Sequence, residues 1–198
     1  MTAEAEWQPF FAELYAGATG VLELRPLAPG MKLNEERQFV PVDAGTFDEK
    51  RVERFIKRCT DREWNAYFGV ALRSRNSIKD KSGDLDHCSV LTALFVDADY
   101  KNSSEDEARR RITEATLPPS LMVSSGGGLH AYWLLEPPLL LKSGGGLADA
   151  RQMLRSVAVS LEDVVDVAVS EPARVLRIPG SLNFKYNPPQ PVQLESVP

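Results

Sequence analysis

The sequence predicts a mixed α+β (α/β) fold in one domain of 198 residues. Apolar residues recur at helical spacing in four stretches, at about residues 3–16, 47–59, 103–115 and 147–161. About eight shorter stretches between them are rich in β-branched and aromatic residues, as strands are. The apolar fraction of 43% and the charged fraction of 26% are typical of a globular protein that can bury a core.

Composition and charge exclude several classes of protein. The net charge of −5 gives no global basic field, so a nucleic-acid partner would need local positive charge and metal ions over any acidic site. Cys59 and Cys88 are too few for a disulfide framework, and we expect two reduced thiols in a cytoplasmic protein. The first ten residues lack the features of a signal peptide, and no apolar run approaches about 18 residues. We therefore expect neither secretion nor a membrane location.

The first part of the chain predicts a helix, two strands and a second helix. The stretch 3–16 places its aromatic residues on one helical face. Residues 21–27 alternate as a strand does, and the proline in 37–42 favours an edge strand. Thr46 is the expected N-cap of the helix over 47–59.

A basic loop, Arg73 to Lys81, follows the next predicted strand, 65–72. One interpretation is an exposed loop kept soluble by its charge. The other is a loop that holds a template strand or a triphosphate next to a metal site. The residues alone leave both open.

A continuous apolar run, Leu91 to Val96, leads into Asp97 and Asp99. Such a run is typical of a strand buried on both faces. Because side chains alternate along a strand, both carboxylates lie on one face, with Cα atoms about 6–7 Å apart. They could share a divalent ion, which would offset the cost of desolvating two like charges. The alternative is a strand that runs out into a solvated acidic turn.

A glycine-rich turn, Ser125 to Gly128, joins the predicted strand 120–124 to a second strand that starts near His130. Three consecutive glycines permit positive φ angles and leave backbone amides unobstructed, which suits an anion such as a phosphate. His130 could donate a hydrogen bond to a triphosphate oxygen. The alternatives are an ordinary hairpin turn and a structural histidine.

A third polar stretch, 163–185, follows the predicted helix 147–161. It supplies further carboxylates, two arginines three residues apart, and a Pro-Gly turn before an asparagine and a lysine. In isolation these residues are compatible with an ordinary surface.

Together the three stretches resemble the archaeo-eukaryotic primase (AEP) superfamily, specifically the primase-polymerases of plasmids, phages and CRISPR-associated systems. Phe95-Val96-Asp97-Ala98-Asp99 is similar to the first motif of the family, h-h-D-h-D. The run from Ser125 to Trp133 is similar to the second, S-G-G-G-x-H-x-Y-W. Asp166 with the run from Ala173 to Lys185 is similar to the third, D…A-R-V-L-R-x-P-G-[ST]-x-N-x-K. The match spans roughly residues 60–187.

The resemblance implies a two-lobed fold within one catalytic domain, 1–198. An N-terminal α/β lobe, about 1–60, would pack on an RRM-like antiparallel sheet, about 61–198. The acidic strand would belong to that sheet, and the active site would lie in the cleft between the lobes.

The resemblance also implies an activity, which is template-dependent transfer of a nucleotide to a 3′-hydroxyl with release of pyrophosphate. The enzyme would be a DNA primase, a DNA polymerase or both, using two Mg²⁺ or Mn²⁺ ions. Its partners would be a single-stranded DNA template, a primer strand, dNTP or NTP, and a helicase or another replication or CRISPR-associated protein. Priming and extension, and the two sugar types, remain open alternatives.

Site residues follow from the resemblance position by position. The metal ligands would be Asp97, Asp99 and Asp166; Asp163 is the alternative third carboxylate, and Asp166 fits the family spacing to Arg174 better. The triphosphate would be held by Ser125, Gly126, Gly127, Gly128 and His130. Phosphate contacts or site orientation would come from Arg174, Arg177, Asn183 and Lys185.

Two other classes of function compete with this interpretation. A metal-dependent nuclease also uses aspartate pairs on strands, but it has no need of a triphosphate-binding turn. A non-catalytic RRM-like nucleic-acid-binding module needs no carboxylate triad and would expose aromatic residues on its sheet.

Overall fold

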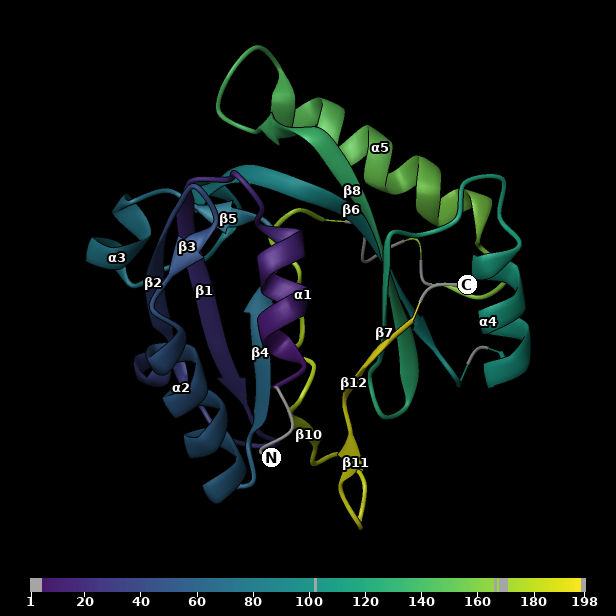
Figure 1. Cartoon of the computed structure of the whole chain (residues 1–198), viewed down its shortest axis with the longest axis horizontal. Helices are drawn as coiled ribbons and strands as arrows, with labels where there is room; N and C mark the ends of the chain where they lie inside the picture. The colour runs from purple at the N-terminus through teal and green to yellow at the C-terminus, as the bar shows by residue number, and fades with distance from the viewer. Residues whose placement is uncertain (1–4, 102, 166, 168–170, 197–198) are drawn as a thin grey trace.

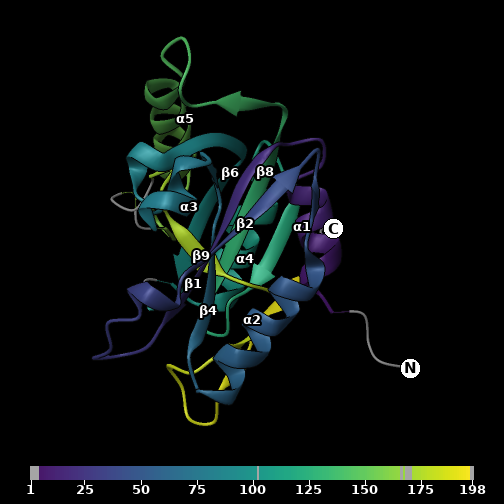
Figure 2. The ribbon, with the colours of Figure 1, turned by 90° about the vertical axis from the view of Figure 1, so that its left-hand side faces the viewer.

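An antiparallel sheet organises the chain, and two groups of helices cover it (Figures 1 and 2). The computed structural model describes residues 5–101, 103–165, 167 and 171–196. The helices in this part of the chain are α1 (Trp7–Leu14), α2 (Glu49–Asp61), α3 (Asn76–Asp80), α4 (Glu105–Thr113) and α5 (Gly146–Ser160). Single 3₁₀ turns occur at Asn34–Glu36 and Leu85–His87.

The large sheet holds ten strands within the described residues, and all of its recorded pairings are antiparallel. They are β1 (Gly20–Leu27), β2 (Gln38–Asp43), β3 (Thr46–Phe47), β4 (Asn65–Gly69), β5 (Leu72–Arg73), β6 (Cys88–Asp99), β7 (Leu121–Ser124), β8 (Gly128–Leu140), β9 (Val175–Arg177) and β12 (Gln193–Glu195). A separate ribbon pairs β10 (Leu182–Asn183) with β11 (Gln190–Pro191).

The sheet forks at β1. The main path runs β12-β7-β8-β6-β5-β1-β2-β3, and the second branch leaves β1 through β4 to β9. One edge of β1 therefore pairs with β5 at Val21 and with β4 from Leu24 onward. The mixed α/β class with an antiparallel sheet is confirmed. The lobes are not separate sheets, however, because β5 links β1 to β6 by continuous pairing. A lobe boundary near residue 60 stays a prediction.

The two faces of β6 and β8 have different neighbours. On one face, Tyr132 of β8 contacts Phe10 of α1, with 5.2 Å between the ring centroids, and Phe10 also contacts Phe68 of β4 at 5.5 Å. The opposite face, which includes Leu94 and Trp133, is covered by α4 and α5. Alternation along the strand places Asp97, Asp99 and His130 on the α1 face.

The start of α2 differs from the sequence prediction. Asp48, not Thr46, is the N-cap, and its side chain accepts a hydrogen bond of 3.1 Å from the Arg51 amide. Thr46 lies instead in β3, because Phe47 packs against the aromatic rings of α1 and holds this segment extended. Tertiary packing decides between two residues that are both good caps.

The basic loop is also different from the expectation of a continuous exposed segment. Arg73 ends β5 and is fully buried, and residues 76–80 form α3. The later basic side chains, Arg75, Lys79 and Lys81, are exposed, which is compatible with both interpretations of the loop.

Among the helices that the structure describes, none has the length and apolar character needed to cross a membrane.

Phe10 joins the two branches of the fold, and its removal is expected to be costly. Phe10→Ala should lower the free energy of unfolding by about 3–5 kcal/mol, because it leaves a cavity between β4 and β8. Urea denaturation measures this change. Glu13→Ala, at an exposed position of the same helix, should change stability by less than about 0.5 kcal/mol. Equal effects of the two variants would contradict the packing described.

Candidate active site

The pairing of β6 with β8 brings the first two sequence motifs together. Asp97 lies opposite His130 in the ladder, and Asp99 lies opposite Gly128. The Nε2 atom of His130 is 3.6 Å from Oδ1 of Asp97. Asp97 and Asp99 are partly exposed, whereas Ala98 between them is buried. The carboxylates therefore reach the surface on one face of the sheet, next to the histidine.

Glycine is required where the turn meets β6. A Cβ atom on Gly128 would lie 2.4 Å from the carbonyl oxygen of Ala98, so a side chain there would force the strands apart. Gly126 has φ +71°, a conformation that glycine adopts at little cost. The Ser125 amide donates to the Gly128 carbonyl at 2.9 Å and closes the turn. Within the described residues, the Gly126 and Gly127 amides donate to no backbone carbonyl.

Asn183 holds this turn from the third motif. Its buried side-chain amide donates to the carbonyl oxygens of Ser125 at 3.0 Å and Gly126 at 3.1 Å. Its Oδ1 accepts a hydrogen bond of 3.1 Å from the Lys185 amide. Asn183 thus fixes the backbone of the turn.

Arg174 and Arg177 have different environments. The guanidinium of Arg174 lies 3.2 Å from Oδ2 of Asp97. Arg177 stacks instead on the ring of Tyr67, 5.0 Å from its centroid, and its Nε lies 3.5 Å from Oδ1 of Asn65. Only Arg174 of this pair contacts a predicted metal ligand among the recorded interactions.

Lys101 is a site residue that the sequence reasoning missed. Its backbone amide donates to Oδ1 of Asp99 at 3.1 Å, and its ammonium lies 3.3 Å from Oδ2. Partial burial disfavours ionisation of Asp99, but these contacts with Lys101 outweigh it and hold the pKa of Asp99 below its usual value. The adjacent ammonium of Lys101 lowers the pKa of Lys185, against the attraction of Asp99. A lysine two residues after the acidic pair was the available signal.

His130 is only 2% exposed, and burial lowers its pKa to about 4, against the attraction of Asp97. The charges of Arg177 and Arg174 act in the same direction as burial. The imidazole is therefore neutral at pH 7, with one N–H to donate and one nitrogen to accept. Its Nδ1 is buried without a hydrogen-bond partner among the described residues.

The third carboxylate is not located by the structure, because Asp166 lies outside the described residues. Asp163 is directed elsewhere: its carboxylate lies 2.6 Å from the guanidinium of Arg111 on α4, which covers the opposite face of the sheet. Among the described residues no group of three or more His, Cys, Asp or Glu side chains forms a metal-binding cluster. The carboxylate oxygens of Asp97 and Asp99 are hard ligands of the kind that Mg²⁺ and Mn²⁺ prefer, so the pair fits part of such a site.

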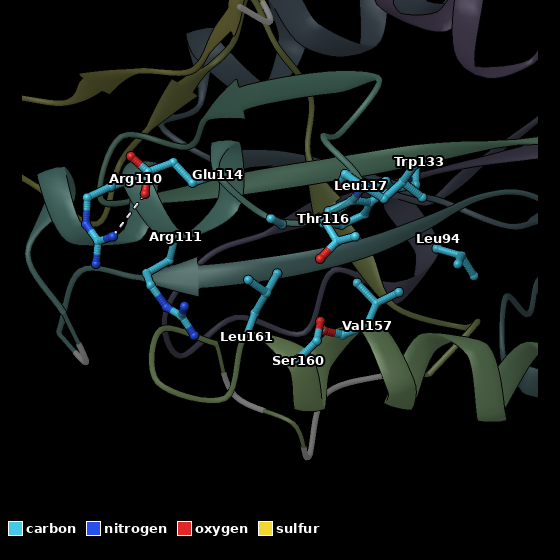
Figure 3. A pocket seen from close by; sticks show the side chains of 11 residues that line it. Leu94, Arg110, Arg111, Glu114, Thr116, Leu117, Trp133, Val157, Ser160 and Leu161 are labelled. Carbon is cyan, nitrogen blue, oxygen red and sulfur yellow. Dashed lines mark hydrogen bonds and ion pairs between the residues drawn. The ribbon is translucent and has the colours of Figure 1, made fainter.

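Two hollows open on opposite faces of the sheet. One, of about 480 Å³, adjoins the end of β6 and the glycine turn, and is lined by Asp99, Lys101, Gly126, Gly127 and Tyr186, among others. The other, of about 380 Å³, contains Leu94, Trp133 and Leu161 (Figure 3). Leu94 and Trp133 lie on the face of the sheet opposite to Asp97, so this second hollow is separate from the carboxylates.

Comparison with known proteins identifies the fold. No family model matches the sequence, and no curated protein does. The AEP domain of the cyanophage S-2L primase-polymerase superposes with a TM-score of 0.56 at 15% identity, covering 90% of this chain and 82% of that one. The catalytic domain of primase RepB′, solved in complex with initiator DNA, gives 0.55 at 16% identity, covering 98% and 85%. A longer structure of primase RepB′ gives 0.57 at 15% identity, and this chain spans 56% of it. The chain therefore has the AEP primase-polymerase fold.

The pKa values of the two histidines should be shifted in opposite directions from the ordinary value. His130 should titrate near pH 4, and His87, hydrogen-bonded to Asp80 and Asp84, above its usual pKa of about 6.5. Since the unfolded chain binds a proton at His130 more readily than the folded chain, the His130 contribution to stability is full above about pH 6.5 and is lost toward pH 4. NMR titration of the two ring signals, assigned with His87→Gln, measures both values. A His130 signal that titrates above pH 6.5 would contradict its burial beside Asp97.

Proposed function

We propose that this protein is a template-dependent nucleotidyltransferase, a DNA primase or primase-polymerase. One observation carries the proposal. In a fold shared with primases, Asp97 and Asp99 emerge on one face of β6 beside His130 and Arg174. The glycine turn, whose Gly126 and Gly127 amides donate to no backbone carbonyl among the described residues, adjoins them. Two carboxylates, an imidazole, a guanidinium and a glycine turn that could bind phosphate therefore lie close together.

Asp97 and Asp99, with Asp166 as the third carboxylate, would hold two Mg²⁺ or Mn²⁺ ions. Such ions lower the pKa of the attacking 3′-hydroxyl and neutralise the charge that develops on the α-phosphate and pyrophosphate. The chain's own residues would place the nucleotide. His130, neutral at pH 7, would donate a hydrogen bond to a phosphate oxygen, and the amides of Gly126 and Gly127 would bind the same group.

Cationic side chains complete the phosphate site in this proposal. Arg174 would contact the triphosphate from beside Asp97, Lys101 from beside Asp99, and Lys185 from beside Lys101. Arg177 stays on Tyr67 and contributes through its charge. Ser125 and Asn183 would act through the backbone of the turn.

The nucleic-acid partner we propose is single-stranded DNA with a primer strand. The support is the structural likeness to a primase solved with initiator DNA. Contacts to the phosphate backbone and stacking on bases would give little sequence specificity.

The RRM-like binding module is less compatible with the packing. On the α1 face of β8, Tyr132 is buried under Phe10, so it cannot serve as an exposed aromatic platform for RNA bases.

Templated synthesis tests the proposal directly. The protein is incubated with single-stranded DNA, with and without a primer, using dNTP or NTP and Mg²⁺ or Mn²⁺. Products longer than the primer, with a sequence complementary to the template, are expected. Synthesis without a primer would identify a primase. Shortening of labelled DNA without any extension would support the nuclease alternative and contradict the proposal.

Variants of Asp97 and Asp99 test whether nucleotide incorporation depends on the acidic pair of this protein. Asp97→Asn and Asp99→Asn should each reduce incorporation by at least about 100-fold, because a metal ligand is lost while shape is kept. Asp149→Asn, at an exposed position on α5, is the matched control and should stay within about twofold of the wild type. Unchanged incorporation in both site variants would exclude the predicted metal site.

A further inference from the structure

Arg73 forms a fully buried ion pair with Glu23. Both side chains are 0% exposed, and a guanidinium nitrogen of Arg73 lies 2.9 Å from Oε2 of Glu23. The Nε–H of Arg73 donates to the same oxygen at 3.1 Å. Burying two charges is costly unless the remaining donors and acceptors are also satisfied. The position of those remaining partners indicates what the pair holds in place.

The guanidinium of Arg73 donates hydrogen bonds to three parts of the chain outside its own segment. Besides Glu23 on β1, it donates to Sγ of Cys88 at the start of β6, at 3.2 Å. It also donates to the carbonyl oxygen of Ala173, one hundred residues away in sequence, at 3.3 Å. A fourth bond, of 2.6 Å, goes to the Ala71 carbonyl in its own segment. Arg73 therefore lies at the fork of the sheet and contacts both branches.

The contact with Ala173 bears on the site because Arg174 is the next residue. The carbonyl of Arg174 accepts a hydrogen bond of 3.4 Å from the Val70 amide, so its backbone is fixed on both sides to the β4–β5 region. From this anchored backbone the Arg174 side chain reaches Asp97 on β6 at 3.2 Å. The position of Arg174 relative to β6 thus depends on the group that binds Cys88 and Ala173 together.

The space around Arg73 is closed. A Cβ atom on Gly69 would lie 2.5 Å from a guanidinium nitrogen of Arg73, and one on Gly83 would lie 1.8 Å from the carboxylate of Glu23. Gly69 at the end of β4 and Gly83 in the loop before β6 therefore leave the room that the pair fills. Arg73 itself has no recorded contact with Asp97, Asp99 or His130, so it does not act on the reacting groups directly.

We propose that Arg73 is a positioning residue for nucleotidyl transfer. It sets the location of the Arg174 guanidinium beside Asp97 by holding the Ala173 carbonyl and β6 in one hydrogen-bond network. This inference rests on the proposed function, in which Arg174 binds the incoming triphosphate. A lysine at position 73 could neutralise Glu23, but its single ammonium lacks the planar fork that reaches Glu23, Cys88 and Ala173 together.

The test uses Arg73→Lys and a matched control, Arg25→Met. Arg25 binds the other oxygen of the same Glu23 carboxylate, at 2.6 Å, and has no recorded bond to Ala173. Arg73→Lys should raise the KM for the nucleotide about tenfold and change kcat by less than about threefold. Arg25→Met should leave both constants within about twofold. A purely structural role would lower the active fraction, and hence kcat, without a selective change in KM.

A double-mutant cycle with Arg174→Ala separates positioning from general damage. If Arg73 acts through Arg174, then Arg73→Lys should change KM by less than about twofold in the Arg174→Ala background. If the two substitutions instead raised KM independently, so that their effects multiplied, the inference would be overturned and the proposed function would be unaffected. Should Arg73→Lys fail to fold, the paired replacement Glu23→Leu with Arg73→Met removes both charges together and serves in the same cycle.

A readout independent of activity keeps the two proposals distinguishable. The guanidinium ¹⁵N signals of Arg174, identified by their loss in Arg174→Lys, should shift in Arg73→Lys and not in Arg25→Met. An unmoved Arg174 signal in Arg73→Lys would overturn the inference, whether or not the wild type incorporates nucleotides. Absence of templated synthesis by the wild type, in contrast, would overturn the proposed function.

Discussion

The register between β6 and β8 is the constraint on which the candidate site depends. Asp97 is placed opposite His130, and the backbone approach of Gly128 to Ala98, too close for any side chain, permits that register at the end of the ladder. Because side chains alternate along a strand, a slip of one residue would turn both carboxylates toward the face covered by α4 and α5. The apolar residues that alternate with the carboxylates, such as Val96 and Ala98, oppose such a slip, since they would leave the core.

The fork of the sheet at β1 brings arginine side chains to the acidic strand. One branch, through β5, bears Asp97, Asp99 and His130; the other, through β4, bears Arg177 and leads back to Arg174. Asp97 and Arg174 therefore come from segments that do not pair with each other, and their side chains meet at 3.2 Å across the fork. The buried Glu23–Arg73 pair lies where the branches separate. Stability of the core and geometry of the site thus depend on the same region.

The sequence predicted the features that local patterns encode. The apolar run before Asp97, the glycine turn and the helical stretches all appear as strands, a turn and helices at nearly the expected positions. Features set by contacts between distant residues were missed. Arg73 was predicted to lie in a basic loop that is either exposed or in contact with a template or triphosphate, because nothing near it in sequence reveals Glu23 or Ala173 as partners. The N-cap of α2 was misplaced for the same reason, since Phe47 is held by α1. Lys101 was overlooked because a lysine after an acidic turn is common on surfaces.

In the function proposed above, Asp97 and Asp99 bind the metal ions of a nucleotidyl-transfer site. Crystals soaked with Mn²⁺ and a non-hydrolysable dNTP test it most directly, because anomalous scattering locates the ions without relying on activity. We expect Mn²⁺ peaks about 2.1 Å from carboxylate oxygens of Asp97 and Asp99, with the triphosphate against His130 and the glycine turn. Mn²⁺ and nucleotide bound elsewhere, with Asp97 and Asp99 still paired only to Arg174 and Lys101, would contradict it.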